Sequence, residues 1–434
     1  MSPTTVGLIG LVLLVVLLFS RMPVGFVMAL LGFVGFSYMV SFEAGISLLA
    51  KDIYAIFGSY SLTVIPLFVF MGQIAFHAGM SRRLYDSAYK FMGHWPGGLA
   101  MATIGACAGF SAICGSTNAA AATMASVALP EMKRYGYDMK LATGTVAAGG
   151  SLGILIPPSV IFIVYGIMTE QSIGKLFASG ILPGMLLASL FLVTILIWTR
   201  VRPDLGPRGP RSGLRERFRS LWGLGEMLGI FAIVMGGLFK GFFTPTEAGA
   251  IGAFSTLVIA IFRRQISWSG FCEALVETTR ISCMVLVIVT GATVFGHFLA
   301  ITRIPFELAG WVKGLPLPAW GIMGVIIFLY LIGGCFMDAL ALILLTINIF
   351  FPVAVDSLGY DPIWFGVIIV MVTEMGVITP PVGVNVYVVS GVAKDVPLET
   401  IFKGIFPLLL ALITAVILMI IFPQIALFLP GFIH

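Results

Sequence analysis

Two proline doublets are the residues of this sequence best placed to do chemistry. Pro157-Pro158 follows Gly153 in the string GILIPPS, and Pro380-Pro381 follows Gly376 in GVITPPVGVN, both within apolar runs. Proline has no backbone N–H, so a doublet breaks a helix and leaves the carbonyls before it without donors. Such carbonyls suit a cation, and the helix starts after the prolines suit an anion. The doublets predict two ion sites, with plain structural kinks as the alternative.

A polar run, Ser116-Thr117-Asn118, lies upstream of the first doublet, between Gly115 and four alanines. Hydroxyl and amide oxygens suit a hard cation such as Na⁺, so we predict a turn here that faces the first break. The predicted Na⁺ ligands are Ser116, Asn118, Gly153 and Pro157. The predicted substrate contacts of this half are Ser116, Thr117, Asn118 and Ser159. Helix capping by Ser116 or Asn118 is the alternative, and one side chain is able to do both.

The second candidate tip contains Asp338, the only acid in a long apolar stretch. A carboxylate in the membrane costs about 2.5–3.5 kcal/mol on insertion scales, which favours a functional role over capping alone. The predicted ligands of a second Na⁺ site are Met337, Asp338, Gly376 and Thr379, and the predicted substrate contacts of this half are Asp338 and Asn385. Glu374 is another lone acid beside Thr373. Two interpretations of Glu374 remain open: it takes part in proton coupling, or it is a structural acid held by a partner residue.

Composition shows which elements must position these residues. The chain is 59% hydrophobic and 10% charged, with a mean hydropathy of +1.09. A soluble domain of average composition has ~25% charged residues, so most of this surface must face lipid. We expect a multi-pass helical membrane protein. Its net charge of +5 lies mainly in loops, which indicates membrane orientation and not nucleic-acid binding.

Apolar runs long enough to cross the bilayer are expected near 5–20, 22–40, 60–80, 139–168, 176–199, 222–243, 247–262, 282–302, 362–392 and 400–428. Stretches 42–58 and 265–281 are charged or amphipathic, and we expect helices along the membrane surface there. Stretches 96–131 and 318–353 are apolar but interrupted near their middles.

Seven arginines follow residue 199 and mark a cytoplasmic loop, 201–221. Counting crossings from this loop places both termini in the periplasm. The count holds only if the two interrupted stretches enter and leave by one face. They are therefore predicted to be re-entrant hairpins, the first at about 90–135 and the second at about 318–353.

An internal repeat relates the two halves. Gly136-Tyr137-Asp138 recurs as Gly359-Tyr360-Asp361, and the glycine and proline doublet that follow recur at the same offset of 223 residues. The charge count gives the halves opposite orientations. We therefore predict inverted repeats over 1–200 and 222–434, the architecture of elevator-type secondary transporters with sites near the midplane.

Other classes fit less well. A channel needs a continuous polar pore lining, whereas the polar groups here are isolated. The sequence has no H-E-x-x-H and no G-x-x-x-x-G-K-[ST], so neither a metalloprotease nor an ATP-driven pump is indicated. Its five cysteines lack C-x-x-C spacing. We expect no enzymatic activity.

Five strings carry a family resemblance: GSTNAAAAT, GILIPPS, FTPTEAGAIGA, FMDALALILLTINIFFP and VITPPVGVNVYV. They occur in family order over essentially the whole chain. The sequence resembles the large membrane (M) subunit of tripartite ATP-independent periplasmic (TRAP) transporters.

The resemblance implies a bacterial inner-membrane importer of small carboxylates, such as C4-dicarboxylates or sialic acids, driven by Na⁺. It also implies two partners, a small four-helix membrane (Q) subunit and a soluble periplasmic substrate-binding (P) protein. A stand-alone Na⁺/carboxylate symporter of the wider ion-transporter group remains the alternative.

Overall fold

The helices of the chain form two series with the same order of elements. A computed structural model describes residues 2–20, 22–314 and 316–433, and every regular element in those ranges is helical. The first series is α1 (Pro3–Phe19), α2 (Val24–Met39), α3 (Phe42–Phe57), α4 (Val64–His77), α5 (Met80–Met92), α6 (Gly98–Cys114), α7 (Thr117–Arg134), α8 (Met139–Gly150), α9 (Val160–Met168) and α10 (Ile173–Val201).

The second series is α11 (Leu214–Phe239), α12 (Pro245–Phe262), α13 (Trp268–Ile301), α14 (Ile304–Gly314), α15 (Ala319–Phe336), α16 (Ala339–Phe351), α17 (Pro362–Val377), α18 (Val384–Val392), α19 (Leu398–Ile421) and the short α20 (Gln424–Leu427). Short 3₁₀ turns cover Ser61–Thr63, Ser151–Gly153, Pro203–Leu205 and Pro430–Phe432, and a π turn covers Pro352–Ser357. Helices α6 and α15 begin 221 residues apart, at 98 and 319, and α10 and α19 begin 225 apart, at 173 and 398.

The repeated Gly-Tyr-Asp motif has a local physical explanation. Gly136 and Gly359 have φ of 72° and 75°, the left-handed conformation that ends a helical segment and favours glycine. Two residues later the aspartate caps the next helix: Asp138 accepts from the amide of Lys140 at 2.7 Å, and Asp361 accepts from that of Ile363 at 2.8 Å. The motif thus ends each hairpin and starts each broken helix.

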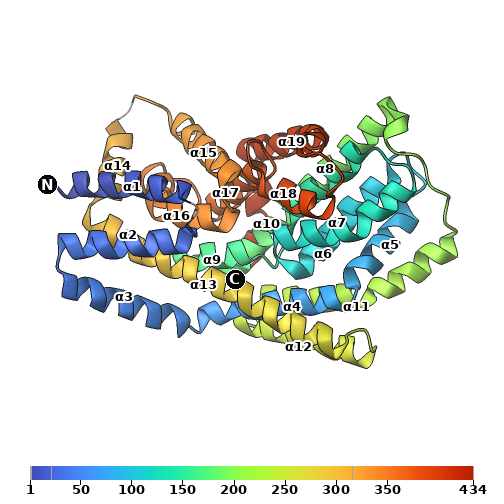
Figure 1. The fold of residues 1–434 in the computed structure, drawn as a ribbon, viewed down its shortest axis with the longest axis horizontal. Helices are drawn as coiled ribbons and strands as arrows, with labels where there is room; N and C mark the ends of the chain where they lie inside the picture. The colour runs from blue at the N-terminus through green and yellow to red at the C-terminus, as the bar shows by residue number, and fades with distance from the viewer. Residues whose placement is uncertain (1, 21, 315, 434) are drawn as a thin grey trace.

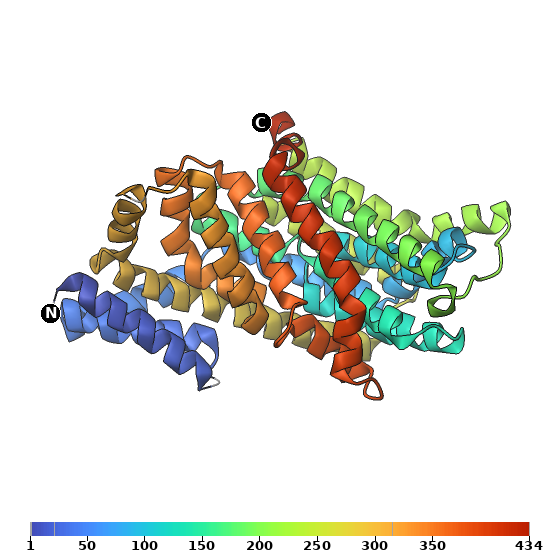
Figure 2. The ribbon, with the colours of Figure 1, turned by 90° about the horizontal axis from the view of Figure 1, so that it is seen from above.

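Two hairpins occupy opposite halves of the molecule. Helices α6 and α7 form the first and lie to the right in Figure 1, and α15 and α16 form the second and lie to the left. Figure 2, seen from above, also shows the two hairpins on different sides of the molecule. Helix α13 packs against α2, α4 and α16 and runs past both hairpins. This arrangement confirms the predicted all-helical fold with two hairpins and two helices broken at proline doublets.

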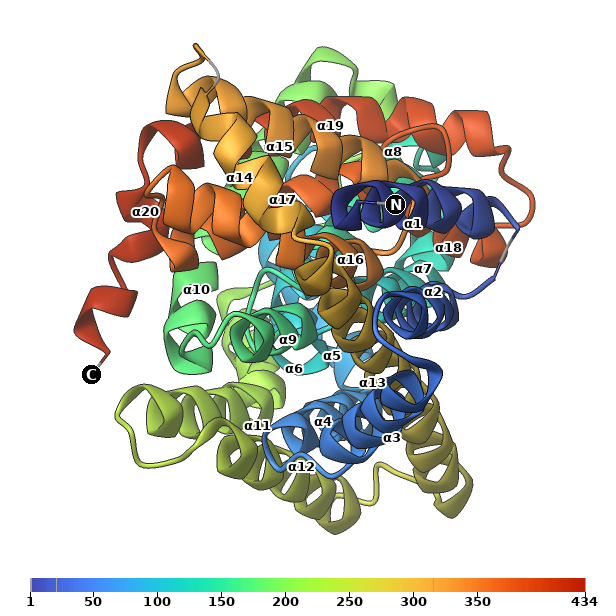
Figure 3. The same cartoon turned by 90° about the vertical axis from the view of Figure 1, so that its left-hand side faces the viewer.

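Two groups of helices pack side by side. The first contains α2, α3, α4, α11, α12 and α13, and the second contains both hairpins, the broken helices and α19. The end-on view in Figure 3 separates α3, α4, α12 and α13 below from α15, α17 and α19 above. We call the first group the scaffold helices.

By length and composition, six of the described helices could cross a membrane, or up to eight if each of two bent pairs counts as one span. Two of these six are the arms of the second hairpin, α15 and α16 with its π turn. A hairpin arm can thus be as long and apolar as a helix that crosses the membrane. The predicted crossings at 5–20 and 22–40 correspond to α1 and α2, of 17 and 16 residues.

One prediction about surface helices is wrong. Stretches 265–281 and 282–302 do not form a surface helix and a separate span, because α13 is one helix of 34 residues. No glycine or proline lies near Ile281 to end it, so the helix continues. In the first half α3 and α4 are separate and bent by 54°, with Gly58 at the C-cap of α3.

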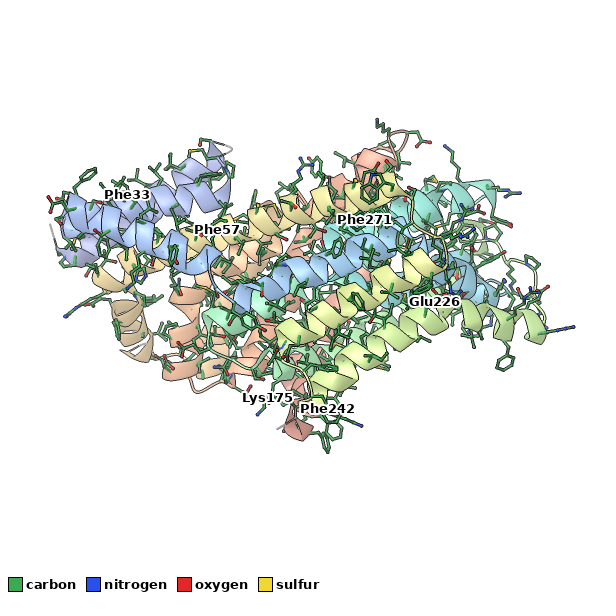
Figure 4. All side chains as sticks on the ribbon, turned by 90° about the horizontal axis from the view of Figure 1, so that it is seen from below. Phe33, Phe57, Lys175, Glu226, Phe242 and Phe271 are labelled. Carbon is green, nitrogen blue, oxygen red and sulfur yellow. The ribbon has the colours of Figure 1, made fainter. Side chains whose placement is uncertain are left out.

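A buried acid fastens the arginine-rich end of the scaffold. The side chain of Glu226 on α11 is 8% exposed, forms an ion pair with Arg263 at the end of α12, and lies 4.0 Å from Arg83 of α5. Figure 4 shows Glu226 near the middle of α11. Glu226 thus links α11 to α5 and to the end of α12.

Candidate functional site

The tips of the two hairpins are built alike. Ser116 is the N-cap of α7, where its hydroxyl accepts from the amide of Ala119 at 3.4 Å. Asp338 is the N-cap of α16 and accepts from the amide of Leu340 at 3.1 Å. The capping roles considered for both residues are therefore present. Each cap leaves oxygen lone pairs that are free to bind another group.

The two tips meet. The amide nitrogen of Asn118 lies 3.3 Å from Asp338 Oδ1, a contact between residues 220 apart in sequence. Asn118 Oδ1 is buried and has no hydrogen-bond partner among the described residues. Amide and carboxylate oxygens left over in this way are the donor set that a hard cation takes.

The first break packs directly on the first tip. In an α-helix the carbonyls of Gly153 and Ile154 would accept from residues 157 and 158, but prolines stand there. A Cβ on Gly153 would lie 2.6 Å from the carbonyl oxygen of Ser116, so only glycine allows this approach. Pro157 is buried, and Ser159 caps α9 by accepting from the amide of Phe162 at 3.4 Å.

The second break packs just before the second tip. A Cβ on Gly376 would lie 2.6 Å from Gly334, and the amide of Gly383 donates to the carbonyl of Cys335 at 3.3 Å. The hydroxyl of Thr379 donates to the carbonyl of Met375 at 2.5 Å, and Met337 is half-buried. Both doublets contain a cis peptide bond. The breaks differ in exposure, because Pro157-Pro158 is buried and Pro380-Pro381 is exposed.

A cavity of about 80 Å³ lies between the tips and the scaffold helices. Its polar lining includes Ser116, Thr117, Asn118 and Asp338. The first residues of α7, α9 and α16 also line it, so three helix N-termini converge there. Helix N-termini and backbone amides favour an anionic group.

Gln73 of α4 was missed by sequence reasoning and faces the same cavity. A second cavity of about 730 Å³ shares Gln73, Cys114 and Ala119 with the first, and runs between α4, α7 and α13 to Glu273 and Glu277. The signal for Gln73 is an amide within the apolar run 64–76. Such a residue in a membrane helix usually faces a partner or a water-filled space.

Thr117 and Asn385 are brought together away from the tip contact. The hydroxyl of Thr117 lies 2.8 Å from the carbonyl of Gly150 and 3.0 Å from Glu374 Oε2, and the amide of Asn385 donates to it at 3.2 Å. The structure thus places Glu374 beside two of the predicted substrate residues. The sequence left open whether this acid couples protons or is a structural acid with a partner. These three side chains are buried.

One ion pair outside the apolar core links the first hairpin to the second half. Lys133 at the end of α7 pairs with Asp395, in the loop between α18 and α19. The hydrogen bond from this ammonium lowers the pKa of the Asp395 carboxyl from its ordinary value. The pair therefore holds at neutral pH and is lost as pH falls through that lowered pKa.

Comparison with known proteins identifies a family. The sequence model described as "Tripartite ATP-independent periplasmic transporter, DctM component" matches residues 11–425. A large permease of Pseudomonas aeruginosa named for C4-dicarboxylate TRAP transport is 40% identical, over 86% of each chain. A sialic acid TRAP large permease of Vibrio cholerae is 34% identical, over 95% of this chain and 96% of the relative.

A third relative is longer than this chain. The isethionate TRAP permease DctMQ of Oleidesulfovibrio alaskensis is 38% identical over 86% of this chain but only 58% of its own length. Among solved structures, the YdaH transporter of Alcanivorax borkumensis superposes with a TM-score of 0.62 at 13% identity, covering 88% of each chain. At that identity the likeness concerns the fold alone.

Proposed function

The chain belongs to the DctM component family of tripartite ATP-independent periplasmic transporters, a class of non-enzymatic membrane permeases, and we propose that it is the transport subunit of a Na⁺-driven importer of small organic acids. The observation that carries this proposal is the meeting of the hairpin tips, Asn118 on Asp338, at a cavity faced by three helix N-termini. A midplane site with unpaired oxygens beside amide-rich helix starts suits a cation and an anion together.

The coupling follows from charge. An ionised Asp338 would be negative at the cavity and would repel a carboxylate substrate. Na⁺ taken up by the oxygens of Ser116, Asn118 and the Gly153 and Pro157 carbonyls, and by those around Met337, Asp338, Gly376 and Thr379, would reverse that sign. A substrate carboxylate then gains from both the cations and the helix N-termini. Without Na⁺ it meets an uncompensated acid. Ser159 and Asn385 are buried outside the lining of this cavity, and their predicted contact with substrate stays a prediction.

The moving part is proposed to be the second helix group. Hairpins and broken helices share one packed unit, whereas the scaffold helices contact it along α4 and α13. An elevator needs such a division, with the substrate held on the moving unit. The membrane is the bacterial inner membrane, and we propose that the arginine-rich segment 201–221 is cytoplasmic and both termini are periplasmic.

Two protein partners complete the proposed system. The name DctMQ of one longer relative supports a small membrane subunit as one of these partners. A periplasmic binding protein would deliver the acid. C4-dicarboxylate, sialic acid and isethionate, the solutes named for the relatives, are all anions, which helix N-termini favour.

Uptake into proteoliposomes tests the proposal. The chain is reconstituted with the small membrane subunit and the binding protein, and labelled succinate and sialic acid are offered under an inward Na⁺ gradient. We expect uptake of at least one acid to fall to background when K⁺ replaces Na⁺. Equal uptake in the two salts would contradict Na⁺ coupling. Full uptake without the binding protein would favour a stand-alone symporter.

A further inference from the structure

The buried hydroxyl of Thr117 has more acceptors than it can satisfy. Glu374 Oε2 lies 3.0 Å away and the Gly150 carbonyl 2.8 Å away, while Asn385 Nδ2 approaches at 3.2 Å as a donor. A hydroxyl donates one hydrogen only. If the hydrogen points to Gly150, the oxygens of Thr117 and an ionised Glu374 face each other without a hydrogen between them. If it points to Glu374, the Gly150 carbonyl loses this donor.

The amide of Asn385 is oriented by its neighbours. Its nitrogen also approaches the Ala147 carbonyl at 3.3 Å, so the reverse orientation would set two oxygens against each other. Asn385 Oδ1 is consequently left without a partner among the described residues, and so is Glu374 Oε1. Glu374 is 2% exposed and Asn385 is fully buried.

Among the described residues, no positive side chain offsets this carboxylate. Within the described part of the chain, Glu374 forms no ion pair with a lysine, arginine or histidine. A buried carboxylate without a positive partner is unfavourable, so it takes up either a cation or a proton. The donors gathered here are a carboxylate, a hydroxyl, an amide oxygen and main-chain carbonyls, which is hard-cation chemistry.

We propose that Glu374, Thr117 and Asn385, with the carbonyls at the end of α8, hold an additional Na⁺ that is separate from the two tip sites. One carboxylate among neutral oxygens balances one monovalent charge, whereas a divalent ion would leave a positive charge buried. The inference rests on the proposed Na⁺-driven function. It deepens that function by adding a third cation to each transport cycle.

The place of this site in the fold explains what it would do. Thr117 begins α7, Glu374 lies on α17 and Asn385 lies on α18, so the ion joins the first hairpin to both segments of the second broken helix. Its binding would lock these elements together before the tips close on substrate. Na⁺ would then stabilise the chain even in the absence of substrate.

Counting bound ions tests the site directly. The full chain, purified with its small membrane subunit in nanodiscs, is equilibrated with ²²Na⁺ at saturating concentration and constant ionic strength. Glu374→Gln keeps the size of the side chain and removes its charge, and we expect it to bind one Na⁺ fewer per chain than the parent. Asp52→Asn is the matched control. Asp52 is also a buried acid, but it lies 3.4 Å from His297 on α13, and the count should not change.

A second variant keeps the test decisive if Glu374→Gln does not fold. Glu374→Asp retains the charge but shortens the side chain by one methylene. The Na⁺ concentration that half-saturates this one site should therefore rise about tenfold, equivalent to ~1.4 kcal/mol. Unchanged ion count in Glu374→Gln, or unchanged affinity in Glu374→Asp, would overturn the site, and a proton on Glu374 would then be the explanation. If the parent chain binds no Na⁺ at all, the proposed function itself fails.

Discussion

Replacing Asp338 with asparagine is expected to lower Na⁺-driven uptake by about 10- to 100-fold, because a hydrogen bond or contact to a charged group contributes about 1.5–3 kcal/mol and each ~1.4 kcal/mol is a factor of ten. Asparagine caps a helix nearly as well as aspartate, so α16 should keep its start. The loss would appear as a higher half-saturating Na⁺ concentration in the proteoliposome assay. This substitution separates the capping role, which the structure shows, from the ion-binding role, which we propose.

Asp361→Asn provides the control for Asp338→Asn. Asp361 caps α17 through the amides of Ile363 and Trp364, at the far end of the broken helix from the tips. Uptake by this variant should stay near the parental rate, and thermal unfolding of both variants should be similar. Parental Na⁺ dependence in Asp338→Asn would show that the carboxylate is only a helix cap.

The double substitution Pro157→Ala with Pro158→Ala is expected to abolish coupled uptake, leaving less than about 1% of the parental rate. The two alanines would restore donors for the Gly153 and Ile154 carbonyls, which favours a continuous helix by ~3 kcal/mol or more for each proline removed. Oxygens engaged in the helix would no longer be available to an ion. The readouts are uptake and the number of Na⁺ ions bound per chain.

Prolines inside two unbroken helices supply a matched control. Pro183 and Pro407 lie inside α10 and α19, at corresponding places in the two halves, and neither helix is broken there. The double variant Pro183→Ala with Pro407→Ala should retain Na⁺-dependent uptake. If the doublet variant also retains it, the freed carbonyls are not ion ligands.

Local chemistry explains why so much of the fold is readable from the sequence. Proline doublets, positive-φ glycines and capping aspartates act over a few residues, and their effects repeat at one offset. The hairpins therefore appear where the sequence predicts them. Their tips carry Asn118 and Asp338, and the structure adds that these two side chains touch.

Other features depend on packing between distant segments. The convergence of Thr117, Glu374 and Asn385 joins residues more than 250 positions apart, from 117 to 374. Spacing shows that Glu374 is isolated along the chain, but it does not show which residues surround it.

The central claim is that the two hairpin tips, each with its Na⁺ site, act as one coupled unit, and a double-mutant cycle tests it most directly. Half-saturating Na⁺ for uptake is measured for the parent, Asn118→Ala, Asp338→Asn and the double variant. We predict that the double variant is little worse than the more impaired single variant, with a coupling of ~1 kcal/mol or more, as for residues in contact. Effects of the two substitutions that simply multiply would contradict a shared site.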